Sequence, residues 1–278
     1  MRSGMSPADP FTATALLAWR ELRFRLGSIW FWAASSATCV LAWLYGAGFV
    51  ASFATESVIV TTDPLLALNA LVVVFLGIVL GLRLAGSMAW EREHRTLEVL
   101  LIGPAGWPTI ICAKFLVEIV VLAILILIYA LYLAVAQPLG AGVIGASELA
   151  GLILVPFFAL PVMAGGLVIG AGLGTVRAAV VVFLAAFGVL AAMDIAYAAL
   201  IAQPVEQQSL TGLYALHAFD VAAPVLDHVS PAHVLATPIR AFVLQIALPP
   251  SAVGLPLGQA ALFVVLAILI GRLRGALR

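Results

Sequence analysis

The sequence predicts an all-α, polytopic membrane protein with six transmembrane helices, and two observations lead to that prediction. Hydrophobic residues make up 64% of the 278 residues, whereas soluble domains contain about 45–50%. Long apolar runs follow one another along the chain, and crossing a bilayer core takes about 20 helical residues. No long polar block separates these runs, so we expect residues 1–278 to form a single membrane domain.

An amphipathic helix is expected over 11–27, before the first span. On a helical wheel Arg20 and Arg23 lie opposite a cluster of apolar side chains. This pattern is typical of a helix that lies in the plane of the membrane interface. The alternative is a plain cytoplasmic extension of the first span. The apolar side chains are Phe11, Ala15, Ala18, Trp19, Leu22 and Leu26.

The predicted spans are the apolar runs at 29–51, 65–87, 109–136, 149–174, 178–202 and 256–271. The stretch 232–248 is also apolar, but Pro238 and Arg240 interrupt it, which favours an interfacial or re-entrant helix. The whole loop 203–255 is too apolar for a solvated loop. Its prolines are expected to divide it into short helices at the outer face.

The distribution of basic residues supports six spans with both termini in the cytoplasm. In that topology, twelve of the thirteen Lys and Arg residues lie on the cytoplasmic side, and Arg240 is the exception. Lys and Arg favour this side in short loops. A seventh span at 232–248 would move the three C-terminal arginines outside, so the rule argues against it.

The most charged stretch of the chain lies between the second and third spans. Helix is expected to continue out of the second span over 87–102, to break at Gly103-Pro104, and to begin again at Trp107-Pro108. Charges in this position cannot lie in lipid. The segment 87–104 must therefore lie at the membrane face, where a soluble partner can reach it.

This stretch resembles the ABC-2 type permeases, which are membrane subunits of ATP-binding-cassette transporters. Two residues depart from the family pattern: Arg95 and Ala113 stand where Gly is usual. The amphipathic helix 11–27 and the pair Ser230-Pro231 in the outer loop are also similar to the family. The matching residues are Glu91-Arg92-Glu93, Thr96-Leu97-Glu98, Leu100-Leu101, Pro104 and Lys114.

The resemblance implies a permease subunit that couples to a separate cytoplasmic ATPase dimer, with export as the usual direction. It also implies a second permease copy or a paralogue, contact with membrane lipids, and a bacterial inner (plasma) membrane location. The residues implied to couple to the ATPase are Arg20, Arg23, Glu91, Arg92, Glu93, Arg95, Thr96, Leu97, Glu98 and Pro104.

We expect no catalytic residue, cofactor or metal on this chain itself. A phosphate-binding loop needs Lys followed by Ser or Thr, but the only lysine, Lys114, precedes Phe115. ATP and Mg²⁺ are therefore expected on the partner subunit. No basic domain is present that would bind nucleic acid.

Several residues inside the spans carry weaker predictions. Asp194 and Tyr197 are candidates for a substrate path, although Asp194 is equally suited to a hydrogen bond between helices. Glu118 is expected to form a local pair with Lys114. Gly stripes in the second and fourth spans favour close helix packing within the subunit, or alternatively a dimer seam or a moving seam.

Two other classes of function stay open at this point. One is an intramembrane enzyme, which needs paired polar residues at one membrane depth. The other is a proton-coupled secondary transporter that uses Asp194, although no inverted repeat is visible.

Overall fold

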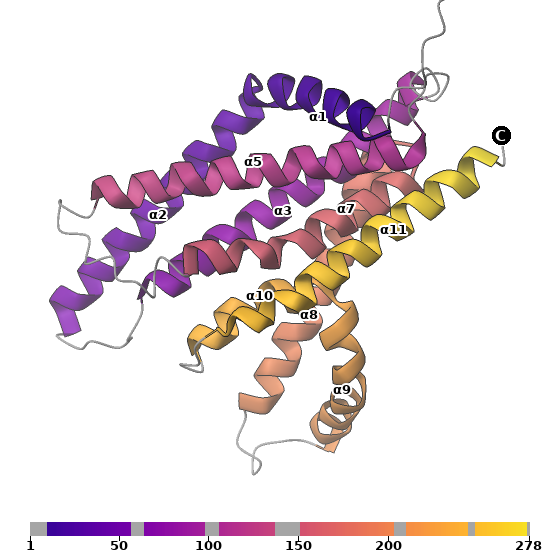
Figure 1. Cartoon of the computed structure of the whole chain (residues 1–278). Helices are drawn as coiled ribbons and strands as arrows, with labels where there is room; N and C mark the ends of the chain where they lie inside the picture. The colour runs from indigo at the N-terminus through magenta and orange to yellow at the C-terminus, as the bar shows by residue number, and fades with distance from the viewer. Residues whose placement is uncertain are drawn as a thin grey trace, which may run out of the picture.

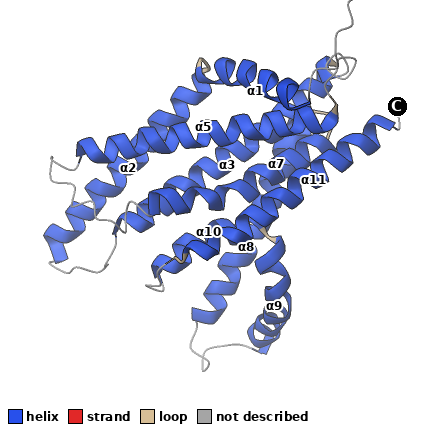
Figure 2. Cartoon of the chain, in the orientation of Figure 1, coloured by secondary structure: helices blue, strands red, loops and turns tan. Residues whose placement is uncertain are grey.

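The computed structural model describes residues 10–56, 64–97, 106–136, 151–202, 210–243 and 248–276. Within these ranges every regular element is a helix (Figure 2). The elements are α1 (Pro10–Leu26), α2 (Ile29–Glu56), α3 (Pro64–Glu93), α5 (Trp107–Ala136), η2 (Val155–Ala159), α7 (Leu160–Gly172), α8 (Val176–Ala202), α9 (Leu210–Val229), α10 (Pro231–Val243), η4 (Pro250–Val253) and α11 (Gly254–Ala276).

Six of these segments are long and apolar enough to cross a membrane, which confirms the predicted all-α fold with six spans. They coincide with the six predicted runs to within a few residues at most ends. The segments are Ile29–Gly46, Leu65–Glu93, Trp107–Val135, Gly151–Gly172, Val176–Tyr197 and Pro250–Arg274.

Proline shapes two of the spans in ways that the apolar runs do not reveal. The fourth span is not one α-helix, because its middle tightens into the 3₁₀ turn η2, with Pro156 near its start and Pro161 in the first turn of α7. The sixth span begins before Pro256, which lies in the first turn of α11. Proline costs little there because first-turn N–H groups have no helical partner.

Helix α3 is central in the bundle, and α7 packs along both α3 and α11 (Figure 1). Glycines make the α3–α7 approach possible. A Cβ atom added at Gly166 would lie 2.0 Å from the carbonyl oxygen of Gly81, and one added at Gly170 would lie 2.6 Å from that of Ala85. Gly81, Gly166 and Gly170 therefore serve close packing of α3 and α7 within one subunit.

The region between the fifth and sixth spans contains non-spanning helices, as predicted, but two of its prolines lie inside helices and do not separate them. Helix α9 is 20 residues long and contains Pro224, and α10 contains Pro238. These prolines do not divide the chain, because a helix tolerates the loss of one hydrogen bond when its neighbours compensate. Helix α10 does not span: it packs against α3, and Leu235 approaches Gly77.

Helix α1 packs along α5 (Figure 1). Its contact side includes the expected Ala18, Leu22 and Leu26, together with Leu17. Trp19, which was expected on the same apolar side, is 62% exposed instead. The contact side also contains charged groups that the helical wheel did not single out, and these belong to the site.

Candidate functional site

Three consecutive side chains at the end of α3 each contact a different part of the bundle. Glu91 forms an ion pair of 2.8 Å with Lys114 of α5. The Arg92 guanidinium lies 5.4 Å from the ring centroid of Trp107, at the start of α5. Glu93 accepts a hydrogen bond of 3.0 Å from the backbone N–H of Val176.

These contacts extend to the spans α5, α8 and α11. The Glu93 carboxylate lies at the N-terminus of α8, where unpaired N–H groups and the helix dipole favour a negative charge. Trp107 in turn packs so closely on α11 that a Cβ atom at Gly271 would lie 2.6 Å from its ring. The end of α3 therefore contacts α5 and α8 directly, and α11 through Trp107.

The chain turns directly after these residues. Helix α3 ends at Glu93, so the helix expected through 102 is wrong at this point. Arg95 adopts a left-handed conformation with φ 55°, which an α-helix cannot contain. The Thr96 hydroxyl donates to the carbonyl of Glu91 at 3.1 Å, and His94 stacks on Trp90. A glycine would adopt this left-handed backbone without the steric cost that a side chain adds.

The predicted coupling residues divide into exposed and internal groups. Arg20, Arg23, Arg95 and Thr96 are exposed. Leu97 is buried against Ile110, with Leu17 and Trp107 around them. Glu91 is only 14% exposed and pairs internally, so it is not the free surface charge that the sequence suggested. Glu98 and Pro104 lie outside the described residues.

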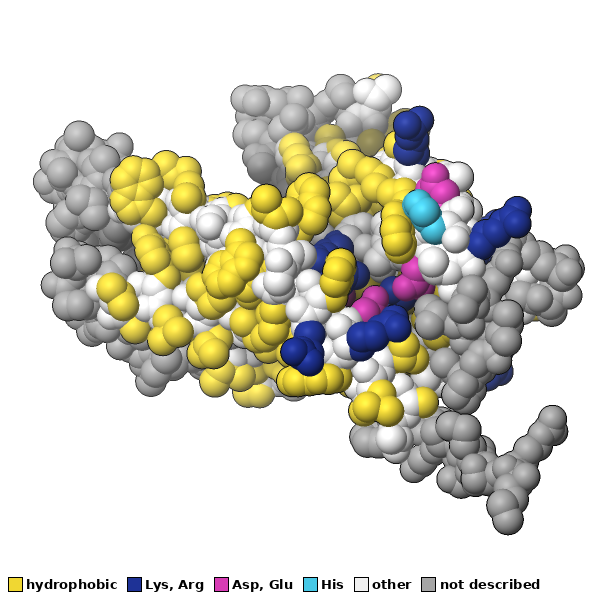
Figure 3. All heavy atoms as spheres, turned by 90° about the horizontal axis from the view of Figure 1, so that it is seen from above, with side chains coloured by type: hydrophobic (Ala, Val, Ile, Leu, Met, Phe, Trp, Pro, Cys, Tyr) yellow, Lys and Arg dark blue, Asp and Glu magenta, His cyan; other side chains and the backbone are white. Residues whose placement is uncertain are grey.

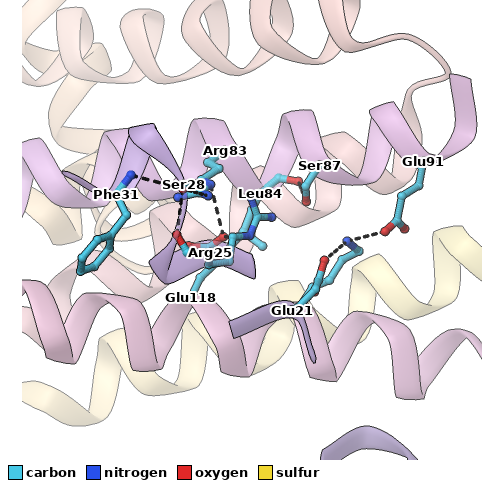
Figure 4. Close-up of polar contacts among 10 residues, drawn as sticks. Glu21, Arg25, Ser28, Phe31, Arg83, Leu84, Ser87, Glu91 and Glu118 are labelled. Atoms are coloured by element: carbon cyan, nitrogen blue, oxygen red, sulfur yellow. Dashed lines mark hydrogen bonds and ion pairs between the residues drawn. The ribbon is translucent and has the colours of Figure 1, made fainter. Parts of the chain in front are cut away.

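A charge network behind the turn connects α1, α3 and α5. The Lys114 ammonium is almost fully buried and lies 2.9 Å from Glu21 of α1 and 2.8 Å from Glu91 of α3. Figure 4 shows the two carboxylates approaching the same ammonium group from either side. The one lysine of the chain thus bridges three helices.

One turn further along α5, Glu118 forms the second layer of the network. Arg25 of α1 and Arg83 of α3 lie 3.5 and 3.9 Å from its carboxylate (Figure 4). The expected local pair between Glu118 and Lys114 is therefore wrong, because each residue has its charge partners on other helices. Arg83 also donates to the hydroxyl of Ser28 at the corner between α1 and α2.

Three members of this network were missed by sequence reasoning. Glu21 and Arg25 stand one turn apart on α1, and that spacing alone suggests an exposed local pair. Arg83 is a lone charge inside an apolar run, and such charges are usually paired or functional. This rule applies to Arg83 as it did to Glu118.

A second polar cluster lies toward the other end of α8. Asp194 accepts from Nδ1 of His233 at 3.0 Å and from Arg240 at 3.2 Å. Arg240 also donates to Nε2 of His233, so the network assigns the imidazole its proton at Nδ1. Tyr197 instead donates to Asp220 of α9. Both predicted path residues thus join α8 to neighbouring helices.

Charged side chains gather toward one side of the face formed by α1 and α5, while the other side is largely hydrophobic (Figure 3). This separation is typical of a protein whose charged end meets water. A scan against protein-family models found no matching family, and a search of curated proteins found no relative.

Proposed function

We propose that this chain is an ABC-2 type permease subunit and that a separate cytoplasmic ATPase contacts the turn between α3 and α5. The observation that carries this proposal is that Glu91, Arg92 and Glu93 each contact another part of the bundle: Lys114, Trp107 and the N-terminus of α8. A partner that displaces this turn displaces the ends of three other spans with it. Such an arrangement suits a segment that transmits a movement of the ATPase to the membrane spans.

The side chains divide into two roles under this proposal. Glu91, Arg92 and Glu93 are positioning residues, because each binds within the chain. Arg95 is exposed at the turn and is our proposed contact with a partner surface, whereas the exposed Thr96 also donates its hydroxyl to the carbonyl of Glu91. Arg20 and Arg23 extend this surface along α1. Exposed charges of this kind mainly set specificity and association rate.

The proposed topology has both termini in the cytoplasm of a bacterial inner membrane. What supports it is that the network gathers Arg25, Arg83 and Lys114 near the turn. Arg240, the predicted exception, pairs with Asp194 in the second cluster. A second permease copy or a paralogue completes the proposed path, and ATP and Mg²⁺ bind on the ATPase.

Asp194 and Tyr197 remain our proposed path residues, and both already have hydrogen-bond partners within the chain. Both side chains hold α8 to other helices, through His233 and Asp220 respectively. A substrate that hydrogen-bonds to either side chain must compete with these contacts. The cargo that fits an apolar surround is hydrophobic or amphipathic, and export is the proposed direction.

The proposal is tested by purifying the chain from its own membranes in mild detergent and identifying co-purifying proteins by mass spectrometry. We expect an ABC ATPase in the eluate and ATP hydrolysis by the complex. A chain that elutes without an ATPase, although it remains folded, would contradict the proposal.

Charge reversal at the turn then tests the contact surface. Arg95→Glu is expected to reduce the recovered ATPase severalfold. Arg274→Glu is the matched control, because Arg274 is also exposed but lies at the end of α11. Glu91→Lys is a poor test, since it also breaks the internal pair with Lys114. Equal recovery from both reversals would refute the role of the turn.

A further inference from the structure

The charges on the facing sides of α1 and α5 alternate in sign from one helical turn to the next. Glu21 of α1 faces Lys114, and Arg25 faces Glu118. Both pairs join residues that are 93 positions apart along the chain. Helices α1 and α5 therefore run in the same direction over this stretch, with their turns in step.

A slip of one turn along α5 in either direction would bring like charges together. If α1 moved forward by four residues, or about 6 Å, Glu21 would face Glu118. If it moved back by the same distance, Arg25 would face Lys114. Like charges at close range in a poorly solvated interface are strongly unfavourable.

We infer that these four charges fix the register of α1 against α5, so that α1 docks in only one position along α5. We call this arrangement of charges the register code. The apolar contacts do not provide this selection. Ala18, Leu22 and Leu26 recur every four residues on the contact side, so a one-turn slip replaces one apolar side chain with another. Buried polar pairs have this registry role in helical assemblies, where they add specificity more than stability.

Helix α3 presents the same signs to α5 from its other side. Glu91 meets Lys114, and Arg83 meets Glu118. The Lys114 layer thus contains two carboxylates, and the Glu118 layer contains two guanidinium groups. Helices α1 and α3 therefore pair with the same two residues of α5, which also fixes their positions relative to each other.

This inference goes beyond the proposed function and does not depend on it. It concerns how α1 is docked, whatever the chain transports or binds. Its mechanical consequence is that α1 and the first turns of α5 move together along their axes without sliding.

Disulfide cross-linking measures the register directly, after Cys39 and Cys112 are replaced by Ser. By the offset of the ion pairs, position 18 faces 111 and position 22 faces 115. Cysteine pairs at 18/111 and 22/115 therefore report the native register. Pairs at 18/115 and 22/111 report slips of one turn in the two directions.

The four cysteine pairs are compared in three charge backgrounds. The natural charges should give the native cross-links only. Glu21→Gln with Arg25→Gln removes the code, so slipped cross-links should appear. Glu21→Arg with Arg25→Glu makes the native register repulsive and both slips attractive, so the ratio of native to slipped products should fall by about tenfold or more.

Arg20→Glu with Arg23→Glu is the matched control, because these arginines are exposed on the other side of α1. It should leave the native cross-links unchanged. A swapped chain that keeps the native pattern would overturn the register code, as would a control that slips equally.

Chemical labelling of Lys114 provides a second measurement that needs no engineered cysteine. Lys114 is the only lysine of the chain and is 4% exposed, and none of the charge variants adds another. An amine-reactive reagent should modify it slowly in the natural chain, and about tenfold faster when the Glu21→Arg, Arg25→Glu swap displaces α1. Equal rates in the folded natural and swapped chains would contradict the code.

Discussion

The substitution Gly166→Ala tests the close backbone approach between α3 and α7. The added Cβ would lie 2.0 Å from the carbonyl oxygen and 2.7 Å from the carbonyl carbon of Gly81. Carbon and oxygen atoms in even the closest favourable contacts remain about 3.3 Å apart. Helices α3 and α7 must therefore separate by more than about 1 Å. Overpacking costs about 1–3 kcal/mol, and we expect about 3 kcal/mol because the obstacle is backbone.

The neighbouring glycine is the matched control. A Cβ atom at Gly165 would meet nothing within 4 Å, although both residues lie on α7. Gly165→Ala should therefore leave stability unchanged or raise it by up to about 1 kcal/mol, because alanine favours the helix. The pair separates the effect of close approach from that of replacing glycine in a membrane helix.

The assay is thermal unfolding of the purified protein in detergent, followed by tryptophan fluorescence. One kcal/mol shifts the midpoint by about 2–4 °C in proteins near this size, so Gly166→Ala should lower it by about 6–12 °C. A Gly166→Ala midpoint within about 1 °C of the natural protein, or an equal loss for Gly165→Ala, would refute the α3–α7 contact.

Three further predictions concern charge and backbone conformation. Lys114→Met should destabilise the protein by about 3 kcal/mol, because it leaves two carboxylates without their cation; adding Glu91→Gln should recover part of this loss in the same melting assay. Arg95→Gly should raise stability by about 1 kcal/mol by relieving a left-handed side-chain conformation, and unfolding that is no slower after this change would contradict the turn geometry. Asp194→Asn should cost only about 1 kcal/mol because Arg240 is partly solvated, and a double-mutant cycle with Arg240→Gln should show coupling between the two sites.

Hydropathy alone predicted the six spans, because a helix that crosses lipid needs a long apolar run wherever it packs. It did not predict where helices bend or pause. Pro224 and Pro238 appeared to divide the chain, yet both lie inside helices. Whether a helix continues through proline depends on neighbours that local sequence does not identify.

The contacts of the candidate site were not predicted from the sequence. Its charged residues Glu91, Arg92 and Glu93 form the end of α3. Lys114 was paired with Glu118 by local spacing, whereas its partners are Glu21 and Glu91. Ion pairs between helices depend on tertiary packing, so no periodicity along one segment reveals them. The left-handed backbone of Arg95 was also not predicted, because helix was expected to continue through this position.

The contacts of Glu93 also have a consequence for the order of assembly during synthesis. The N–H group that it binds belongs to Val176, which is 83 residues further along the chain. At about 5–20 residues per second, the ribosome adds that length in about 4–17 s. Gly271 of α11, which packs against Trp107, is synthesised later still. The end of α3 is therefore made early and reaches its final position only after α11 has been inserted.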